Sequence, residues 1–388
     1  MYCYIMLGDI LYNTSSDSNS KKYLVLSKLG NGAYAQIWLV KDLESKDLYA
    51  IKINKSSINY RNAAIEEIKK YEILNKDTNE NVIHMVDHFE YQNRYYQDQY
   101  HICIVFELAI CDLHNGYTDL FGNFYDDNNI MYPKIYNIIT QQILKGVQYI
   151  EKCNIIHCDL KLENILFCMS PDTYKDVKKA VNNILEYQSN YSYKQINKVI
   201  QKVLNELYNN FLHQCLNNPE LISIKITDFG ISYIQGTIDN YNIQTIAYRA
   251  PEIILKLEYP LITTKIDVWS IGCILFELLT KKRLFTRWGT DIKIIEDIIY
   301  YFKIDNFDTM ISNLSICDSL DKPNIESIKR ILLPSPLNYT IVDRLLDRNI
   351  ETQDANNISS FLLYILNVDP TKRPSAGDIL EALQEVNS

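Results

Sequence analysis

Length, composition and charge place this chain among folded globular proteins. Its 388 residues are too many for one ordinary domain and fit a two-lobed enzyme or two domains. The hydrophobic content of 47% and the charged content of 22% are typical of a packed protein rather than a disordered one. The net charge of −9 argues against a nucleic-acid partner and is compatible with a basic peptide substrate.

Cysteine usage and the apolar segments indicate an intracellular protein without a membrane partner. The nine cysteines show no CxxC pairing, and neither Cys153 nor Cys158 has zinc-ligand spacing around it. The apolar start, residues 1–7, is too short for a signal peptide and lacks basic residues. The apolar run 271–276 is interrupted by Glu277 and predicts a buried helix. We expect a cytoplasmic location, with a nuclear or virion-associated one left open.

The first part of the chain predicts a small antiparallel sheet with one helix. Short runs of β-branched and aromatic residues alternate with Gly and polar turns, and residues 62–75 then change to a helical period. The candidate strands are 23–26, 37–40, 48–52, 83–85 and 102–106. We therefore expect an N-terminal extension over 1–22 and a first lobe over 23–108.

The rest of the chain, residues 109–388, predicts a larger and mainly helical lobe. Helical spacing of apolar residues occurs over 136–150 and 377–386, and the segment 269–279 is apolar enough to be a central buried helix. The chain is thus predicted to be α+β.

Residues 169–220 form an unexpected element of this second lobe. Apolar residues repeat at helical spacing from Ile196 to Phe211, and a weaker helix precedes them around Val177 to Leu185. We expect a helical insertion packed on the outside of the larger lobe. Its apolar stripe either packs on the protein itself or forms a docking surface for a partner.

Two polar motifs carry the candidate chemistry. Residues 156–164 read Ile-His-Cys-Asp-Leu-Lys-Leu-Glu-Asn, and residues 228–230 read Asp-Phe-Gly. Phosphoryl transfer needs an oriented hydroxyl, bound cations and neutralisation of charge on the phosphoryl oxygens. An Asp followed five residues later by an Asn, together with a second Asp before a Gly, can supply such a set.

A glycine-containing hairpin precedes these motifs. It lies between two predicted strands, where Gly30 and Gly32 let the backbone approach phosphate groups without a Cβ in the way. Ala35 replaces a third glycine and should slightly stiffen the tip; taken alone, the pattern fits an ordinary β-turn better than a phosphate-binding loop. The hairpin residues are Leu29, Gly30, Asn31, Gly32, Ala33, Tyr34, Ala35, Gln36 and Ile37.

On the next strand, Lys52 is placed to pair with phosphates and needs a carboxylate to hold it. Glu66 and Glu67 both lie on the following predicted helix. Adjacent helical residues point about 100° apart, so only one can face the lysine. We prefer Glu67 and assign Glu66 to the surface.

Later motifs complete a resemblance. Residues 245–252 read Thr-Ile-Ala-Tyr-Arg-Ala-Pro-Glu, and Asp267-Val-Trp-Ser and Asp369-Pro-Thr-Lys-Arg-Pro follow in order. With the earlier motifs, they make residues 22–386 resemble eukaryotic protein kinases. The resemblance implies a bilobal kinase-like fold, ATP and Mg²⁺ as cofactors, and a buried ion pair between Glu252 and Arg373.

The resemblance also implies roles for single residues. Asp159 would accept or orient the proton of the substrate hydroxyl, and Lys161 would stabilise the transferring phosphoryl group. Asn164 and Asp228 would hold Mg²⁺. Lys161 together with Thr245 favours Ser or Thr as the acceptor.

The segment 106–109 resembles the hinge between kinase lobes. Backbone groups of Glu107 and Ala109 would bind the adenine edge, and Asp112 would reach the ribose. The apolar residues expected to sandwich the base are Leu29, Ile37, Ala50, Ile83 and Leu166. Cys158 stands where many kinases have an Arg that contacts a phosphorylated activation segment. We therefore expect switching by phosphorylation to be weak or absent.

Within the kinases the chain is most similar to the SR-protein kinases, which phosphorylate serines in Arg/Ser-rich proteins. The similarity rests on the string Gly8-Asp9-Ile10-Leu11 and on residues 63–69, 101–107 and 141–146. The match over 63–69 also supports Glu67 as the ion-pair partner of Lys52. The insertion here is shorter and more helical than in that family, and Ile246 replaces an Arg common in related kinases. We expect a monomeric Ser/Thr kinase for basic, Ser-rich protein substrates; the alternatives are a pseudokinase scaffold or a docking protein that acts through 169–220.

Overall fold

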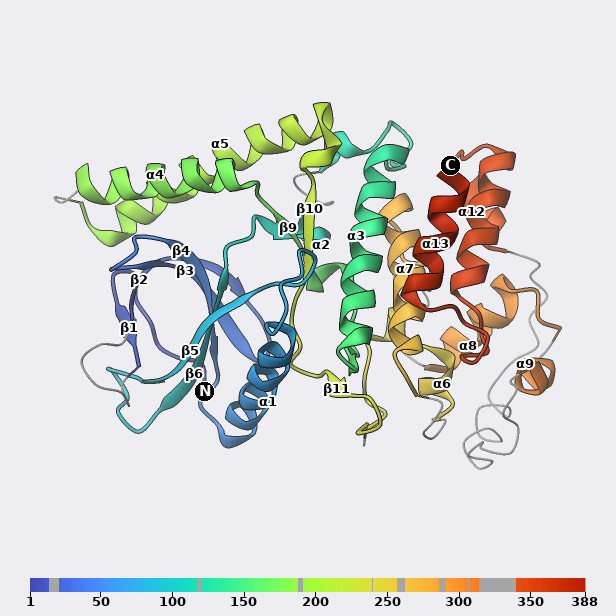
Figure 1. The fold of residues 1–388 in the computed structure, drawn as a ribbon, viewed down its shortest axis with the longest axis horizontal. Coiled ribbons are helices and arrows are strands. Elements are labelled where there is room, and N and C mark those ends of the chain that lie inside the picture. Colours follow the sequence, from blue (N-terminus) through green and yellow to red (C-terminus); the bar gives the residue numbers. More distant parts are fainter. Residues whose placement is uncertain are drawn as a thin grey trace. The chain divides into compact units, whose positions relative to one another are not determined.

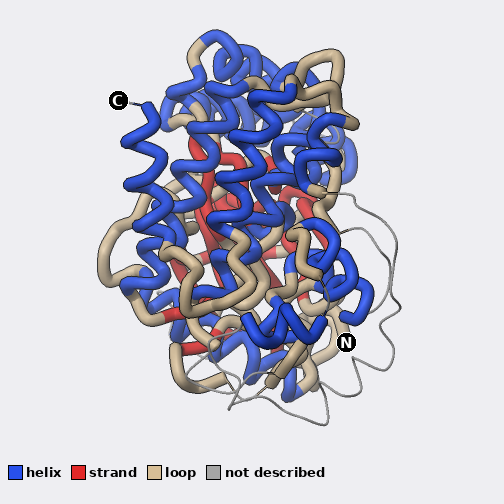
Figure 2. Tube along the Cα trace, turned by 90° about the vertical axis from the view of Figure 1, so that its right-hand side faces the viewer, coloured by secondary structure: helices blue, strands red, loops and turns tan. Residues whose placement is uncertain are grey.

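The structure is a computed structural model that describes residues 1–13, 21–116, 121–187, 191–238, 240–256, 262–285, 291–305, 307–313 and 340–387. The chain divides into two compact units. The first unit comprises Met1–Asp112 and Leu166–Gly230, and the second comprises Leu113–Ile165 and Ile231–Ser388. The first unit combines sheets and helices, and the second is nearly all helix (Figure 1 and Figure 2). The predicted α+β class is confirmed.

A six-stranded antiparallel sheet in the order β1-β2-β3-β4-β6-β5 forms the centre of the first unit (Figure 1). Its strands are β1 (Ile10–Tyr12), β2 (Lys22–Asn31), β3 (Ala35–Asp42), β4 (Leu48–Asn54), β5 (Met85–Gln92) and β6 (Tyr100–Glu107), with helix α1 (Ile58–Leu74) after β4. The strand expected at 83–85 begins only at Met85. Ile83 donates instead from its backbone N–H to the carbonyl of Ile226, at 2.9 Å.

Both faces of this sheet are apolar, because hydrophobic residues occupy consecutive as well as alternate positions of the strands. One face buries Tyr23, Val25 and Trp38 under residues from the N-terminal segment, among them Cys3 and Leu11. The opposite face presents Leu26, Leu39 and Leu48. Cys3 and Leu11 of the predicted N-terminal extension are therefore part of the sheet's own core, and residues 14–20 lie outside the described residues.

The insertion covers the second of these faces. Its helices are α4 (Pro171–Tyr187) and α5 (Tyr193–Asn217), and they lie across β2, β3 and β4 (Figure 1). Val181, Ile200 and Leu204 are buried against Leu39 and Leu48. The predicted helices are confirmed, but their predicted place on the outside of the larger lobe is wrong. The physical reason is that the sheet has a second apolar face that would otherwise meet water.

Polar contacts fix the insertion to the turn between β3 and β4. The Tyr174 hydroxyl accepts a hydrogen bond from the backbone N–H of Leu48, at 3.0 Å. Lys178 Nζ pairs with Asp47 at 2.5 Å, and Ser192 starts α5 with a capping box. The stripe of the insertion thus packs on the protein itself, the simpler of the two expectations.

Short elements complete the first unit. Strands β7 (Cys111–Asp112), β9 (Ile165–Cys168) and β10 (Ser223–Ile226) form a three-stranded sheet in the order β10-β9-β7. A 3₁₀ turn, η4 (Pro219–Leu221), precedes β10. The predicted boundaries at 22/23 and 108/109 stay a prediction.

The second unit is built around the buried helix α7 (Lys265–Thr280), as predicted. Helices α3 (Pro133–Lys152) and α12 (Thr352–Ile365) pack against it, and α13 (Ala376–Asn387) packs against α3. Gly272 permits the close approach of α7 to α12, since a Cβ there would lie 2.5 Å from the Leu366 side chain.

Shorter helices and one small ribbon surround this core. The helices are α2 (Leu113–Asn115), α6 (Pro251–Ile254), α8 (Asp291–Tyr301), α9 (Phe307–Asn313) and α11 (Ile341–Leu346), with 3₁₀ turns η2 (Gly122–Phe124), η3 (Leu162–Asn164) and η5 (Ile246–Tyr248). Strands β8 (Ile155–Ile156) and β11 (Tyr233–Ile234) pair antiparallel. In the described residues no helix is long and apolar enough to cross a membrane. The eight described cysteines are all free.

Candidate functional site

A mostly buried lysine bound to two carboxylates marks the first unit. Lys52, on β4, donates from Nζ to Glu67 Oε1 at 2.8 Å and Oε2 at 2.9 Å, and to Asp228 Oδ1 at 2.8 Å. Glu67 lies on the buried side of α1, whereas Glu66 forms an exposed pair with Lys69 at 2.6 Å. The structure therefore pairs Lys52 with Glu67 and leaves Glu66 on the surface.

Charge and burial act in opposite directions on this cluster. Burial alone would lower the pKa of Lys52, but the carboxylates of Asp228 and Glu67 outweigh it and raise that pKa. Burial raises the pKa of Glu67 against the attraction of Lys52. The Asp228 side chain is 45% exposed and that of Glu67 is 2% exposed. Asp228 is thus the carboxylate of the pair that solvent or a cation can reach.

Tyr71, which the sequence analysis did not identify as a site residue, stabilises the backbone of Asp228. Its hydroxyl accepts a hydrogen bond from the backbone N–H of Asp228 at 3.1 Å. Its ring packs on Phe106 at 4.9 Å and on Phe229 at 5.2 Å between centroids. Asp228 has a φ of 67°, a conformation that costs energy for a residue with a Cβ and needs such support.

The glycine hairpin joins β2 to β3. The backbone N–H of Gly32 donates to the carbonyl of Ala35 at 2.9 Å and closes the turn. A Cβ on Gly30 would lie 3.7 Å from its nearest neighbour, Ile37, and one on Gly32 would lie 3.6 Å from the Ala35 carbonyl. Because these are ordinary contact distances, packing within the protein does not require either glycine. A ligand that approaches the backbone is a sufficient reason for both.

The residues predicted to surround adenine all belong to the first unit. Ala50 lies opposite Phe106 in the β4–β6 register, and Asp112 lies opposite Leu166 in the β7–β9 register. The Glu107 carboxylate is bound by Lys225 Nζ at 2.6 Å and by the backbone N–H of His84 at 2.9 Å. Leu29, Ile37, Ala50, Ala109 and Leu166 are at least partly exposed, whereas Ile83 is buried.

The second unit brings together Asp159, Lys161, Asn164 and Thr245. Lys161 Nζ lies 2.6 Å from Asp159 Oδ2 and donates to Thr245 Oγ1 at 3.2 Å. The Thr245 hydroxyl donates to Asp159 Oδ1 at 2.7 Å. Asn164 Nδ2 donates to the Asp159 carbonyl at 2.9 Å, and within the described residues its amide oxygen accepts no hydrogen bond. That oxygen is the kind of ligand that Mg²⁺ binds.

Asp267, at the start of α7, holds the loop that carries Asp159. Its carboxylate accepts hydrogen bonds from the backbone N–H groups of His157 at 2.6 Å and Cys158 at 3.0 Å. Burial raises the pKa of Asp267 to about 7, against the two backbone donors, which lower it. Cys158 is buried with a φ of 66°, so its backbone conformation depends on this bond.

Gln244 is a second residue that the sequence did not single out. Its backbone N–H donates to the Cys158 carbonyl at 2.8 Å, and its side-chain oxygen accepts from the N–H of Ala250 at 2.9 Å. Its amide nitrogen donates to the Ser270 hydroxyl at 2.9 Å. Gln244 therefore ties the segment around Thr245 both to the loop that carries Asp159 and to α7. The sequence feature that could have indicated a role for Gln244 is its position directly before Thr245.

The expected ion pair between Glu252 and Arg373 is present. Arg373 binds the carboxylate with both nitrogens, at 2.6 and 3.0 Å, and neither side chain is exposed. The bidentate pair anchors α6, which follows the Thr245 segment, to the turn after α12.

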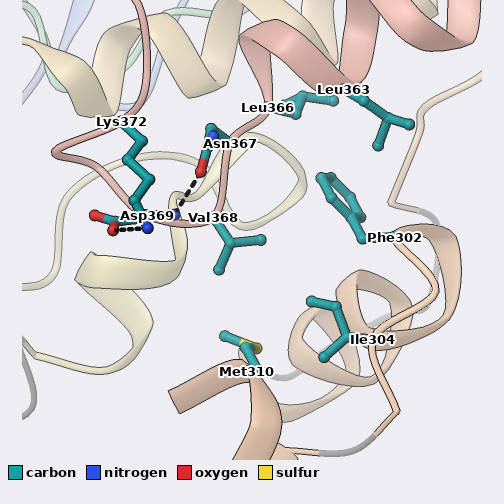
Figure 3. Close-up of a pocket in the computed structure, with 9 residues that line it drawn as sticks. All are labelled: Phe302, Ile304, Met310, Leu363, Leu366, Asn367, Val368, Asp369 and Lys372. Atoms are coloured by element: carbon teal, nitrogen blue, oxygen red, sulfur yellow. Dashed lines mark hydrogen bonds and ion pairs between the residues drawn. The ribbon is translucent and has the colours of Figure 1, made fainter. Parts of the chain in front are cut away.

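A cavity of about 320 Å³ lies elsewhere in the second unit, between the end of α8, α9 and the end of α12 (Figure 3). Six of its nine lining residues are apolar, and the ion pair of Asp369 and Lys372, 3.3 Å apart, lies at one side. Its lining residues are Phe302, Ile304, Met310, Leu363, Leu366, Asn367, Val368, Asp369 and Lys372. No predicted site residue lines it.

Each unit carries groups of the kind that a nucleotide with magnesium needs. In the first unit, Lys52 supplies a fixed ammonium for phosphate oxygens, the glycine hairpin supplies open backbone and Asp228 supplies a carboxylate. In the second unit, the amide oxygen of Asn164 is an oxygen ligand of the kind that Mg²⁺ prefers. Among the described residues no group of three or more His, Cys, Asp or Glu side chains could hold a metal by itself. Phosphate oxygens would therefore have to complete the coordination of Mg²⁺, which usually binds through one or two carboxylates plus substrate phosphates.

Comparison with known proteins agrees with this geometry. A family model described as protein kinase domain matches residues 23–383. The chain is 32% identical over 272 residues to the serine/threonine-protein kinase AFC3 of Arabidopsis thaliana, which covers 69% of this chain and 57% of that protein. It is 28% identical over 376 residues to the serine/threonine-protein kinase SRPK of Physarum polycephalum, covering 92% and 84%.

A third relative is the dual specificity protein kinase YAK1 of Saccharomyces cerevisiae, 33% identical over 263 residues, or 67% of this chain and 24% of that protein. The chain thus spans 57% of the length of AFC3 and 24% of that of YAK1. The relatives include kinases of both Ser/Thr and dual specificity.

Proposed function

This chain belongs to the protein kinase family, and we propose that it transfers the γ-phosphoryl group of ATP to Ser and Thr hydroxyls of protein substrates. The observation that carries the proposal is the arrangement of Asp159, Lys161 and Thr245 in the second unit. A carboxylate and an ammonium share one hydroxyl there, Thr245 Oγ1, in the way that they would share the hydroxyl of an acceptor.

Asp159 orients the acceptor hydroxyl and takes its proton as the oxygen attacks. Lys161, 2.6 Å from that carboxylate, neutralises negative charge that develops on the phosphoryl oxygens. Thr245 binds both groups and keeps them in register. These assignments use only polar groups that the structure describes within one unit.

Lys52 is proposed to bind phosphate oxygens while Glu67 holds it in place, and Asn164 and Asp228 are proposed to bind Mg²⁺. ATP, when bound, supplies the phosphoryl group, and the metal neutralises its charge. The hairpin 29–37 is proposed to cover the phosphates, and the backbone of Glu107 and Ala109 to bind adenine. Asp112 is proposed to reach the ribose, and Ala50 and Leu166 to flank the base.

The proposed substrates are basic and Ser-rich proteins. The net charge of −9 favours a basic peptide, and relatives in the comparison include a kinase named SRPK. Ile246, which is 38% exposed beside Thr245, puts an apolar side chain where related kinases often carry Arg. A peptide array with Arg/Ser-repeat, proline-directed and acidic sequences separates the classes. An intracellular location and a monomeric state are part of the same proposal.

The test is transfer of label from γ-labelled ATP to a basic Ser-containing peptide. Asp159→Asn and Lys52→Met should each lower the turnover of the chain, by about 10²- to 10⁴-fold for Asp159→Asn because the proton acceptor is lost. Near-normal turnover of Asp159→Asn would falsify the assigned role. Binding of nucleotide without any transfer by the wild-type chain would favour the alternative, a pseudokinase scaffold.

A docking role for the insertion, the other alternative, has less support. The stripe of α5 that could have bound a partner is buried against the sheet.

A further inference from the structure

The first twelve residues form a strap, Met1–Tyr12, which ends in strand β1 and is also fixed to the sheet by the side chains of Cys3 and Asp9. Cys3 is buried in the core, where Asn93 Nδ2 donates to its sulfur at 3.3 Å. Asp9 is buried as well and accepts hydrogen bonds from Arg94 Nη1 at 2.8 Å and from the Tyr95 hydroxyl at 3.2 Å. The N–H of Gly8 adds a backbone bond to the carbonyl of Val25 at 2.9 Å. Core contacts therefore determine the course of the strap.

Before Cys3, the strap reaches the glycine hairpin. The Tyr2 hydroxyl donates a hydrogen bond to the carbonyl oxygen of Gly32 at 2.6 Å. The carbonyl of Met1 accepts from the backbone N–H of Ser56 at 3.1 Å, which fixes the start of the strap to the residues that follow β4. A phenol anchored in one part of the sheet thus holds the tip of a turn 30 positions away along the chain.

Lys55 extends this contact to the other side of the hairpin. Its ammonium lies 4.3 Å from the centroid of the Tyr2 ring and 5.0 Å from that of Tyr60, within the range of a cation–π contact. Its backbone N–H donates to the carbonyl of Tyr34 at 3.1 Å, and the Tyr34 and Tyr60 rings meet edge to face at 5.8 Å. Carbonyls on both sides of the tip, those of Gly32 and Tyr34, are held.

We propose that Tyr2 is a positioning residue, which holds the glycine hairpin in the conformation that receives the phosphates of the nucleotide. The proposal rests on the proposed kinase function and names a residue outside the motifs that predicted it. A hairpin with two glycines has many accessible conformations, and a ligand that orders it must offset that entropy. A hairpin that is already ordered binds its ligand more tightly for the same contacts.

The test compares Tyr2→Phe with Tyr4→Phe in the whole chain. Tyr2→Phe removes only the hydroxyl and keeps the ring under Lys55. Tyr4 lies on the same strap, packs edge-on against Tyr95 at 5.0 Å, and its hydroxyl makes no hydrogen bond within the described residues, which makes it a matched control. Dissociation constants for Mg·ATP and for adenosine are measured by calorimetry, and amide hydrogen exchange of the 29–36 segment is measured without nucleotide.

Tyr2→Phe should weaken the binding of Mg·ATP about two- to fivefold, the effect of one partly exposed hydrogen bond. It should leave adenosine binding and the melting temperature unchanged, because adenosine lacks the phosphates and the core anchors of the strap remain. Exchange in the 29–36 segment should be faster than in the wild type. Tyr4→Phe should change none of these quantities.

The positioning role would be overturned if Tyr2→Phe left ATP binding unchanged, or if it weakened the binding of ATP and of adenosine equally. Unchanged exchange in the hairpin would overturn it as well. A wild-type chain that binds no ATP would contradict the proposed kinase function itself. The two failures are therefore distinguishable, since the first kind occurs in a chain that binds ATP normally.

Discussion

The two units hold their candidate functional residues by different physical means. In the first unit, Lys52 is fixed by charge, since its ammonium lies 2.8 Å from oxygens of both Glu67 and Asp228 in a largely buried site. In the second unit, the loop that carries Asp159 is fixed by backbone hydrogen bonds to Asp267 and Gln244. A single charge can therefore determine the position of Lys52 in the first unit, whereas the position of Asp159 in the second unit depends on a network of hydrogen bonds.

Cys158, which stands where many kinases have an arginine, is held by the same kind of backbone hydrogen bonds. Cys158 is uncharged and buried, and its backbone receives one hydrogen bond from Gln244 and gives one to Asp267. The segment around Thr245 is therefore attached to the loop that carries Asp159 without a phosphate group. Arg249 adds an ion pair with Asp291 at 2.7 Å, which lies within the same unit.

The largest effect is expected from the charge in the first unit. Glu67→Gln removes one of the two carboxylates of Lys52, and the lysine should shift toward Asp228. A misplacement of about 1 Å of a group at a reacting centre costs on the order of 10² in rate. We expect kcat/KM for peptide phosphorylation to fall about 100-fold. The steady-state rate at varied ATP concentration is the measurement.

Glu66→Gln is the matched control for this substitution. Glu66 is the neighbouring residue of the same helix, and it pairs only with exposed Lys69. Exposed pairs contribute little to stability or geometry, so its kcat/KM should stay within about twofold of the wild type. Equal losses for the two variants would show that α1 as a whole, rather than the charge of Glu67, sets the activity.

The smallest effect is expected from dephosphorylation, which tests the neutral network of the second unit. Chain purified from cells and treated with a broad-specificity phosphatase should keep its turnover within about twofold, because Gln244 and Asp267 hold the segment without a phosphate. The phosphatase is removed before the assay, and mass spectrometry verifies that phosphate is gone. A loss of activity on treatment would mean that the network is insufficient by itself.

Local patterns predicted the elements of the fold better than their placement. The apolar period of 196–211 predicted α5 correctly because helical periodicity is a property of the segment alone. Its placement on the larger lobe was wrong because the partner of a stripe depends on distant surfaces. The signal was present in strands such as Tyr23-Leu24-Val25-Leu26, whose consecutive apolar residues imply a sheet covered on both faces.

The candidate site divides in the same way. Lys52, Asp159 and Asp228 could be predicted because their motifs combine residue type with a fixed spacing. Tyr71, Gln244 and Tyr2 could not be predicted, since each acts through a hydrogen bond to a residue 30 or more positions away: Asp228 for Tyr71, Cys158 for Gln244 and Gly32 for Tyr2. A tyrosine or glutamine at such a position looks like any other core or surface residue until the fold is known.

The proposed chemistry is that Asp159 and Lys161 act on an aliphatic hydroxyl of the substrate while Thr245 keeps the two groups in register. The most direct measurement offers the purified chain γ-labelled ATP, Mg²⁺ and three basic peptides that differ only in a single Ser, Thr or Tyr. Label is expected on the Ser and Thr peptides well above the level reached by Asp159→Asn, and little label is expected on the Tyr peptide. Label confined to Tyr, or no label above that variant on any peptide, would contradict it.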